Sequence, residues 1–154
     1  MWLEDVPLGG KLTIGRYAFT EENIVAFARQ FDPQAFHLDN DAAARSPYGG
    51  LIASGWHTAA VCMKLMVAYR YLQVAAGEDA TQENYISPGL RDVKWLKPVR
   101  PGTVLTYTTE PFRKLPWPSR PELGLLQSRN EARDDTGALY YSFISQVLIA
   151  KRPQ

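Results

Sequence analysis

One predicted helix constrains the fold of this chain more than any other segment. Ser54 is a suitable N-cap and Gly77 a suitable stop, and the pattern between them predicts helix from Gly55 or Trp56 to about Ala76. Apolar side chains fall on nearly every side of this helix, and no Asp or Glu interrupts it. Because a helix that is apolar nearly all round is usually buried, we expect the rest of the chain to pack around it.

Period-two patterns predict strands on both sides of the long helix. One strand precedes it at Lys11–Phe19, and four follow it, at about Arg91–Lys97, Val104–Arg113, Leu123–Arg133 and Leu139–Ala150. An antiparallel sheet that wraps around a long central helix is a hotdog fold, of the α+β class. A single open sheet leaves an exposed edge, so we expect that edge to pair with a second copy of the chain in a homodimer.

Two shorter helices are predicted before the long one. Thr20 is a suitable N-cap for a helix over Thr20–Gln30, and Asn23 lies at the N3 position, where Glu or Gln would complete a capping box. Pro33 disfavours helical geometry in the residue before it and ends this helix. A further short helix is expected at about Asn40–Arg45.

Length and charge narrow the class of protein. The 154 residues suit a single domain, 1–154, and the net charge of +1 at pH 7 suggests no nucleic-acid or membrane partner. Lys64 and Arg70 interrupt the long apolar segment, so it is not expected to span a membrane. Cys62 is the only cysteine, which excludes an internal disulfide, and the first residues show no secretory signal. We therefore expect a soluble, cytoplasmic protein.

The polar stretch before the long helix contains the candidate catalytic residues. Both histidines of the chain lie between residues 31 and 58, and one of them, His37, follows Asp32 by five positions. A carboxylate and an imidazole can share one water molecule and move protons to and from it. Each residue also has a structural interpretation: Asp32 could cap the turn before Pro33, and His37 could be a loop histidine.

The same stretch resembles the hydratase motif of the MaoC-like dehydratases, a family that includes (R)-specific enoyl-CoA hydratases. The resemblance rests on residues 32–39 (DPQAFHLD), on residues 50–55 (GLIASG) and on a Pro-x-x-Pro-Gly turn at 98–102, and it covers roughly the whole chain. It implies a hotdog fold and interconversion of a trans-2-enoyl thioester and an (R)-3-hydroxyacyl thioester. It also implies that Asp32 and His37 form the catalytic pair and that the backbone N–H of Gly55 polarises the thioester carbonyl.

The chain departs from the family pattern at three places. It has Gln34-Ala35 where the family often has Asn-Pro, and Ser54 where the family often has a histidine before the glycine. Some relatives have a serine on the long helix, and an ungapped count places Met63 at that position. The acid and the histidine of the motif are both present.

Hydration of an enoyl thioester requires a base, an acid and a group that stabilises the enolate oxygen. At Gly55 and Trp56 the start of the long helix offers unpaired backbone N–H groups and the positive end of the helix dipole. Ser54, Trp56 and His57 are therefore the candidate substrate-binding residues, although Ser54 could act only as the N-cap and His57 only as a structural group.

Two other classes of function remain open. A hotdog thioesterase would hydrolyse the same substrate, typically with a carboxylate on or beside the long helix, where this chain has none between 55 and 76. A non-catalytic acyl-CoA-binding protein could dispense with the pair of Asp32 and His37. No cofactor is expected beyond the CoA of the substrate, and two histidines with one cysteine make a metal site improbable.

Overall fold

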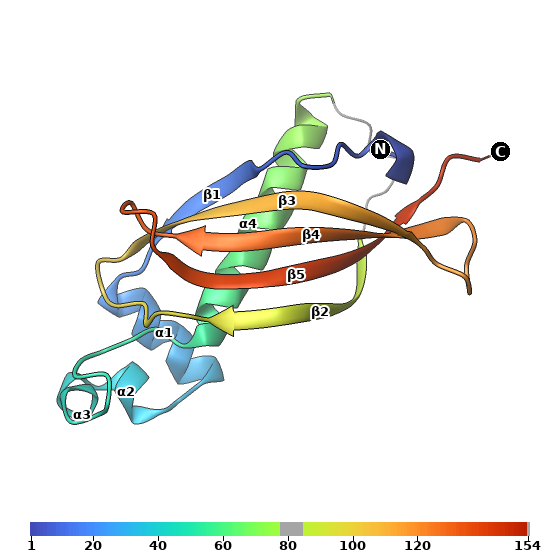
Figure 1. The fold of residues 1–154 in the computed structure, drawn as a ribbon. Coiled ribbons are helices and arrows are strands. Elements are labelled where there is room, and N and C mark those ends of the chain that lie inside the picture. The colour runs from blue at the N-terminus through green and yellow to red at the C-terminus, as the bar shows by residue number, and fades with distance from the viewer. Residues whose placement is uncertain (78–84, 154) are drawn as a thin grey trace.

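The computed structural model describes residues 1–77 and 85–153 and contains one five-stranded antiparallel sheet (Figure 1). The strands lie in the order β1-β3-β4-β5-β2, so β1 and β2 form its edges. Their bounds are β1 Leu12–Ala18, β2 Ile86–Trp95, β3 Val104–Pro116, β4 Leu123–Arg133 and β5 Leu139–Ala150. The first and the last two predicted strands are confirmed to within one residue at each end.

The other two strands differ from their predicted bounds. β2 begins at Ile86 rather than Arg91 and ends at Trp95 rather than Lys97, so it includes Pro88. Proline is tolerated there because β2 pairs only with β5, so one side of its backbone makes no ladder hydrogen bonds within this sheet. β3 extends to Pro116, three residues beyond its predicted end.

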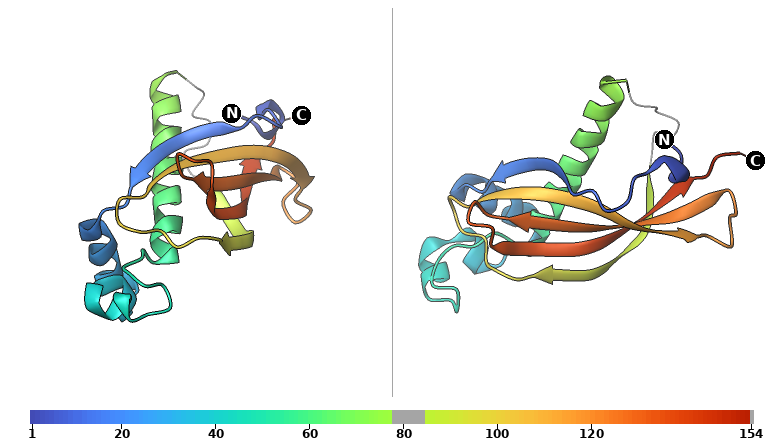
Figure 2. Two further views of the ribbon diagram at one scale, coloured as in Figure 1. Left: turned by 60° about the vertical axis from the view of Figure 1, so that its left-hand side comes forward. Right: turned by 45° about the horizontal axis from the view of Figure 1, so that its top comes forward.

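The long helix α4, Gly55–Ala75, lies against one face of the sheet (Figure 2). Val61 and Cys62 on its inward side are buried in the same apolar cluster as Tyr107 of β3. The phenol of Tyr107 also donates a hydrogen bond of 3.1 Å to the carbonyl oxygen of Thr58. The predicted α+β arrangement of one long helix packed on an antiparallel sheet is therefore confirmed. Among residues 1–77 and 85–153, no helix combines the length and hydropathy needed to cross a membrane.

The side of α4 that faces away from the sheet is exposed. Met63 and Tyr71 are 54% and 69% exposed, and Val67 between them is also exposed. These three residues, spaced four apart, form a stripe along one side of the helix. The expectation that the sheet buries this helix on several sides is therefore wrong for a single chain, because the sheet covers only one side.

Three short helices lie beside the start of α4 (Figure 1). They are α1 Glu21–Phe31, α2 Ala35–Leu38 and α3 Asn40–Ala44, and a 3-10 turn, Leu3–Asp5, precedes them all. Thr20 caps α1 as predicted: its side chain accepts from the N–H of Asn23, whose amide oxygen accepts from the N–H of Thr20. Asparagine thus completes the capping box here. The sequence prediction included α3 but missed α2, whose single turn is too short to show a period.

Candidate active site

The structure brings the candidate acid–base pair into contact. Asp32 is the C-cap of α1 and His37 lies in α2, so the turn between these helices positions both side chains. Nε2 of His37 lies 3.2 Å from Oδ2 of Asp32, and Nδ1 lies 2.7 Å from the carbonyl oxygen of Ile52. A carbonyl oxygen can only accept, so Nδ1 carries a proton and Nε2 is left to face the carboxylate. A hydrogen bond between Nε2 and Oδ2 then requires one more proton, on either atom.

Three neighbouring side chains act on the carboxylate of Asp32. The amide of Gln34 donates to Oδ1 at 2.8 Å, and His37 faces Oδ2. Burial raises the pKa of Asp32, but the hydrogen bonds from Gln34 and Ser54, together with the nearby imidazole, hold this pKa below its ordinary value. The carboxylate is therefore kept in the form that can accept a proton.

The first turn of α4 presents one unpaired backbone donor beside this pair. The N–H of Trp56 donates to Oγ of Ser54 at 3.2 Å, and the N–H of His57 donates to the carbonyl oxygen of Ser54 at 3.0 Å. Within the part of the chain that the structure describes, the N–H of Gly55 has no hydrogen-bond partner. The expectation that both Gly55 and Trp56 offer free N–H groups is therefore correct for Gly55 and wrong for Trp56, since Ser54 satisfies the second group.

A neighbouring side chain leaves no room for a Cβ atom at position 55. A Cβ atom at this position would lie 2.7 Å from Nε1 of Trp95, and the same indole nitrogen donates to the carbonyl oxygen of Gly55 at 2.8 Å. The resemblance to the family gave Gly55 only one role, polarisation of the thioester carbonyl by its backbone N–H. The structure adds a second reason, which is contact with a rigid aromatic ring from β2.

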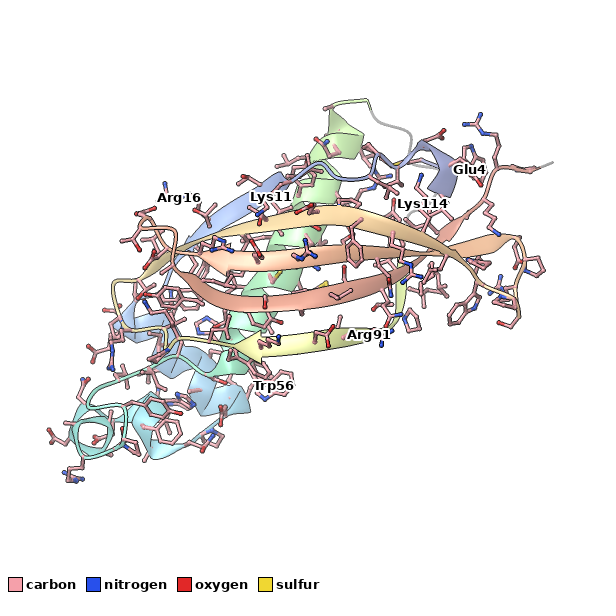
Figure 3. The ribbon with its side chains drawn as sticks, in the orientation of Figure 1. Glu4, Lys11, Arg16, Trp56, Arg91 and Lys114 are labelled. Atoms are coloured by element: carbon pink, nitrogen blue, oxygen red, sulfur yellow. The ribbon has the colours of Figure 1, made fainter. Side chains whose placement is uncertain are left out.

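The side chains of the pair and Gly55 line one open cavity of about 590 Å³. Five aromatic residues contribute to its wall: Phe36, Tyr48, Trp56, Trp95 and Tyr140. Trp56, at the start of α4 beside the short helices (Figure 3), is 63% exposed and meets the ring of Trp95 edge-on at 5.3 Å between centroids. Of the three predicted substrate-binding residues, Trp56 is the one whose side chain faces this cavity.

The other two predicted substrate-binding residues lie elsewhere. Ser54 is fully buried and does not line the cavity, and its side chain accepts from the N–H of Trp56. The ring of His57 is also buried: it stacks on Phe27 at 4.6 Å and meets Tyr17 and Phe19 edge-on. Because His57 packs into an aromatic cluster and does not line the cavity, we assign it no contact with substrate.

Three groups at the site were not found from the sequence. Gln34 was noted only as a departure from the family pattern, although its place two residues after Asp32 is a common spacing for a local side-chain contact. The carbonyl of Ile52 and the indole of Trp95 carry no sequence signal of this kind. Their roles depend on segments that meet only in the folded chain.

Comparisons with known proteins identify the family. The family model described as MaoC like domain matches residues 7–121. The uncharacterized protein YdeM of Bacillus subtilis (strain 168) is 30% identical over 128 residues, 82% of each chain. A MaoC-like dehydratase from Rhodospirillum rubrum is 33% identical, with a TM-score of 0.83 over 100% of this chain and 99% of that one.

A more distant structural likeness agrees with this. The (R)-hydratase PhaJ1 from Pseudomonas aeruginosa is 18% identical, with a TM-score of 0.67 over 98% of this chain and 86% of that one, and shares the fold. Its sheet and long helix correspond to the hotdog arrangement predicted above. The chain therefore belongs to the MaoC-like family and has its hotdog fold.

Proposed function

We propose that this protein adds water reversibly to the double bond of a trans-2-enoyl thioester and forms an (R)-3-hydroxyacyl thioester. One observation carries the proposal: the contact of Asp32 with His37 and the unpaired N–H of Gly55 lie in the wall of one cavity. Together these groups supply the acid, the base and the oxyanion donor that the reaction needs. The named (R)-hydratase with the same fold supports the reaction class.

The pair provides both proton steps without a net change in its own protons. Water loses a proton to one member of the pair as its oxygen bonds to the β-carbon. The other member gives a proton to the α-carbon, and the electrons of the double bond form the new C–H bond. Asp32 and His37 hold one shared proton before and after this cycle. Positioned acid–base groups of this kind contribute about 10²–10⁴-fold to the rate.

The N–H of Gly55 stabilises the charge that develops on the thioester oxygen. As water attacks the β-carbon, electron density moves to this oxygen and forms an enolate. A backbone donor at the positive end of the α4 dipole favours that charge, and one such donor is worth about 3–4 kcal/mol. The carbonyl of Ser54 shares a peptide plane with the N–H of Gly55 and accepts from the N–H of His57 at 3.0 Å, while the indole of Trp95 holds the carbonyl of Gly55. Both contacts restrict the backbone around this N–H before substrate binds.

The carrier of the acyl group in this proposal is CoA. Acyl carrier proteins are acidic, and a chain with a net charge of +1 has no marked excess of positive charge for such a partner. The single cysteine, Cys62, fits the reducing conditions of the cytoplasm, where we place the protein.

The proposal also includes a homodimer with the cavity near its interface. The stripe of Met63, Val67 and Tyr71 lies on α4, and the apolar side chains of Ile86 and Leu90 are exposed on the edge strand β2. A second copy that pairs along β2 would cover this exposed edge and could bury the α4 stripe as well. Trp95, at the end of β2, lines the cavity, so this interface would lie beside the site.

Incubation with crotonyl-CoA tests the reaction class. Loss of the enoyl absorbance without release of thiol, together with chiral identification of (R)-3-hydroxybutyryl-CoA, is the expected result. Release of free CoA would identify a thioesterase, and binding without either change would identify a non-catalytic protein. Repeating the assay with longer enoyl chains and with crotonyl acyl carrier protein then defines chain length and carrier.

A further inference from the structure

The edge strand β2 and the turn that follows it carry basic residues at every third position. These residues, which we call the β2 strip, are Arg91, Lys94, Lys97 and Arg100. All of them are exposed, and Asp92 is the only acidic residue between positions 86 and 109. The segment therefore presents four positive charges against one negative charge at an edge of the sheet.

The neighbouring strand does not compensate this charge. β2 pairs only with β5, and β5 contains no charged residue. On the other side of the sheet, basic residues of the β1 region are paired with acids, as in the contacts of Lys11 with Glu131 and of Arg16 with Asp135. Within residues 1–77 and 85–153, no member of the β2 strip forms an ion pair. The strip is therefore free to bind an anion from outside the chain.

One end of the β2 strip belongs to the cavity. Lys97 lines the cavity wall, with Nζ 5.1 Å from the centroid of the Tyr140 ring, which lines the same wall. Arg100 donates a hydrogen bond of 2.6 Å to the carbonyl oxygen of Tyr48, another wall residue. Arg91 lies on β2, away from the start of α4 (Figure 3). It precedes Lys97 by six positions, which is roughly 20 Å of extended chain, so the strip runs outward from the cavity.

The length of the strip matches a ligand with its negative charge far from the reacting group. In CoA the pantetheine arm separates the thioester from the first phosphate, and it is about as long as five residues of extended chain. With the thioester held in the cavity, the phosphates therefore reach the outer half of the strip. On the basis of the proposed hydration of a CoA thioester, we propose that Arg91 and Lys94 bind the phosphates of CoA. Both side-chain types are common phosphate ligands in proteins.

Two other roles for the charges of the β2 strip have different consequences. Basic side chains on an edge strand can serve only to prevent unwanted strand pairing, a role that does not depend on any phosphate. An acidic carrier protein is a second candidate, but a protein partner typically covers about 800 Å² of surface, which is far wider than a line of side chains on one strand. Backbone pairing along β2 would leave its side chains on the faces of the sheet, so the strip is compatible with the proposed dimer.

Two double variants and two substrates test the phosphate site. Arg91→Gln/Lys94→Gln removes the outer charges of the strip and leaves the cavity wall intact, because neither residue lines it. Arg29→Gln/Arg113→Gln is the matched control, since it removes the same charge from exposed positions on α1 and β3 outside the cavity wall. For each protein we would measure melting temperature, kcat and KM with crotonyl-CoA and with crotonyl-pantetheine, which has the same thioester and no phosphate.

We expect the Arg91→Gln/Lys94→Gln protein to keep the melting temperature of the wild type and to show a KM for crotonyl-CoA that is higher by about tenfold. Its kcat should change little, because contacts far from the reacting atoms are the same in the ground state and the transition state. Its KM for crotonyl-pantetheine should equal that of the wild type. Arg29→Gln/Arg113→Gln should leave both KM values within about twofold of the wild type, since salt screens distant surface charges.

Several results would overturn the proposal. One is an unchanged KM for crotonyl-CoA in the Arg91→Gln/Lys94→Gln protein, and another is an equal rise with crotonyl-pantetheine or in the control variant. A higher KM for crotonyl acyl carrier protein but not for crotonyl-CoA would assign the strip to an acidic protein instead.

Failure of the hydratase function gives a different pattern, in which the wild type hydrates no enoyl-CoA. Calorimetric titration of the same proteins with CoA and with pantetheine then tests the phosphate site without turnover. Weaker binding of CoA to the Arg91→Gln/Lys94→Gln protein alone supports the site, and equal binding of CoA to all three proteins contradicts it.

Discussion

The indole N–H of Trp95 donates a hydrogen bond of 2.8 Å to the carbonyl oxygen of Gly55. This contact joins the last residue of the edge strand β2 to the first residue of α4. Both residues line the cavity, and Gly55 also carries the candidate oxyanion donor. Substitution of either residue should alter both the packing and the site, and the two effects need separate tests.

The packing of Gly55 against Trp95 predicts strong coupling between them. Gly55→Ala should destabilise the protein by about 1–3 kcal/mol, because the new Cβ atom meets a rigid indole. In a Trp95→Ala background the same substitution should cost much less, because the indole is gone. Urea unfolding of the four proteins measures this, and we expect a coupling energy of at least about 1 kcal/mol. Additive effects would mean that the ring moves aside without cost.

The N–H of Gly55 can be removed without removing the helix. In the Trp95→Ala background, which makes room for a side chain, Gly55→Pro should lose about 10²-fold in kcat/KM relative to Gly55→Ala. Proline is well tolerated at the first helical position, and Ser54 already has the extended backbone, with φ −57° and ψ 139°, that a residue before proline prefers. If Gly55→Pro and Gly55→Ala have the same melting temperature and the same kcat/KM in this background, Gly55 does not supply the oxyanion donor.

The buried ring of His57 should make stability depend on pH. It is 4% exposed, and burial lowers its pKa to about 4. A folded-state pKa below the unfolded value of 6.5 means that the unfolded chain binds the proton, so stability is full above about pH 6.5 and falls towards pH 4.

His57→Phe keeps an aromatic ring in this cluster and cannot be protonated. Between pH 7.5 and 5, the wild type should lose up to ~2 kcal/mol of unfolding free energy more than this variant. Urea unfolding at several pH values supplies the comparison. Parallel pH curves for the two proteins would show that His57 is not the group responsible.

The exposed stripe on α4 predicts a dimer that a single charge can break. Val67→Glu places a carboxylate in the middle of the stripe and should convert the protein to a monomer, because an unpaired charge in an apolar interface is costly. Ala26→Glu is the control, since Ala26 is exposed on α1, away from the stripe. Light scattering after gel filtration should show a dimer for the wild type and for Ala26→Glu. A monomeric wild type would contradict the assembly.

The features predicted correctly from the sequence depend on local signals. Strands β4 and β5 were predicted at their observed bounds because alternation and the turn at 134–137 are both contained in the segment. Helix α1 was predicted because Thr20 and the helical period agree. The contact of Asp32 with His37 was predicted because only five positions separate the two residues. Its chemistry came from the resemblance to a family.

The features that were missed depend on tertiary structure. An apolar pattern on α4 shows that its surface avoids water, but not whether the chain itself or a second copy covers it. Trp95 reaches Gly55 from a distant strand, and the carbonyl of Ile52 reaches the ring of His37 from a separate segment. No spacing in the sequence reports either contact.

The central claim is that Asp32 and His37 transfer the protons of hydration, and the rate of crotonyl-CoA hydration by Asp32→Asn tests it most directly. The amide keeps the shape of the side chain but cannot accept the proton of water. We predict a folded protein with a melting temperature close to that of the wild type and turnover reduced at least about 10²-fold. His37→Ala should lose a similar factor, and the double variant little more, because both groups act on one water molecule. A folded Asp32→Asn protein that retains half of the wild-type turnover would contradict the account.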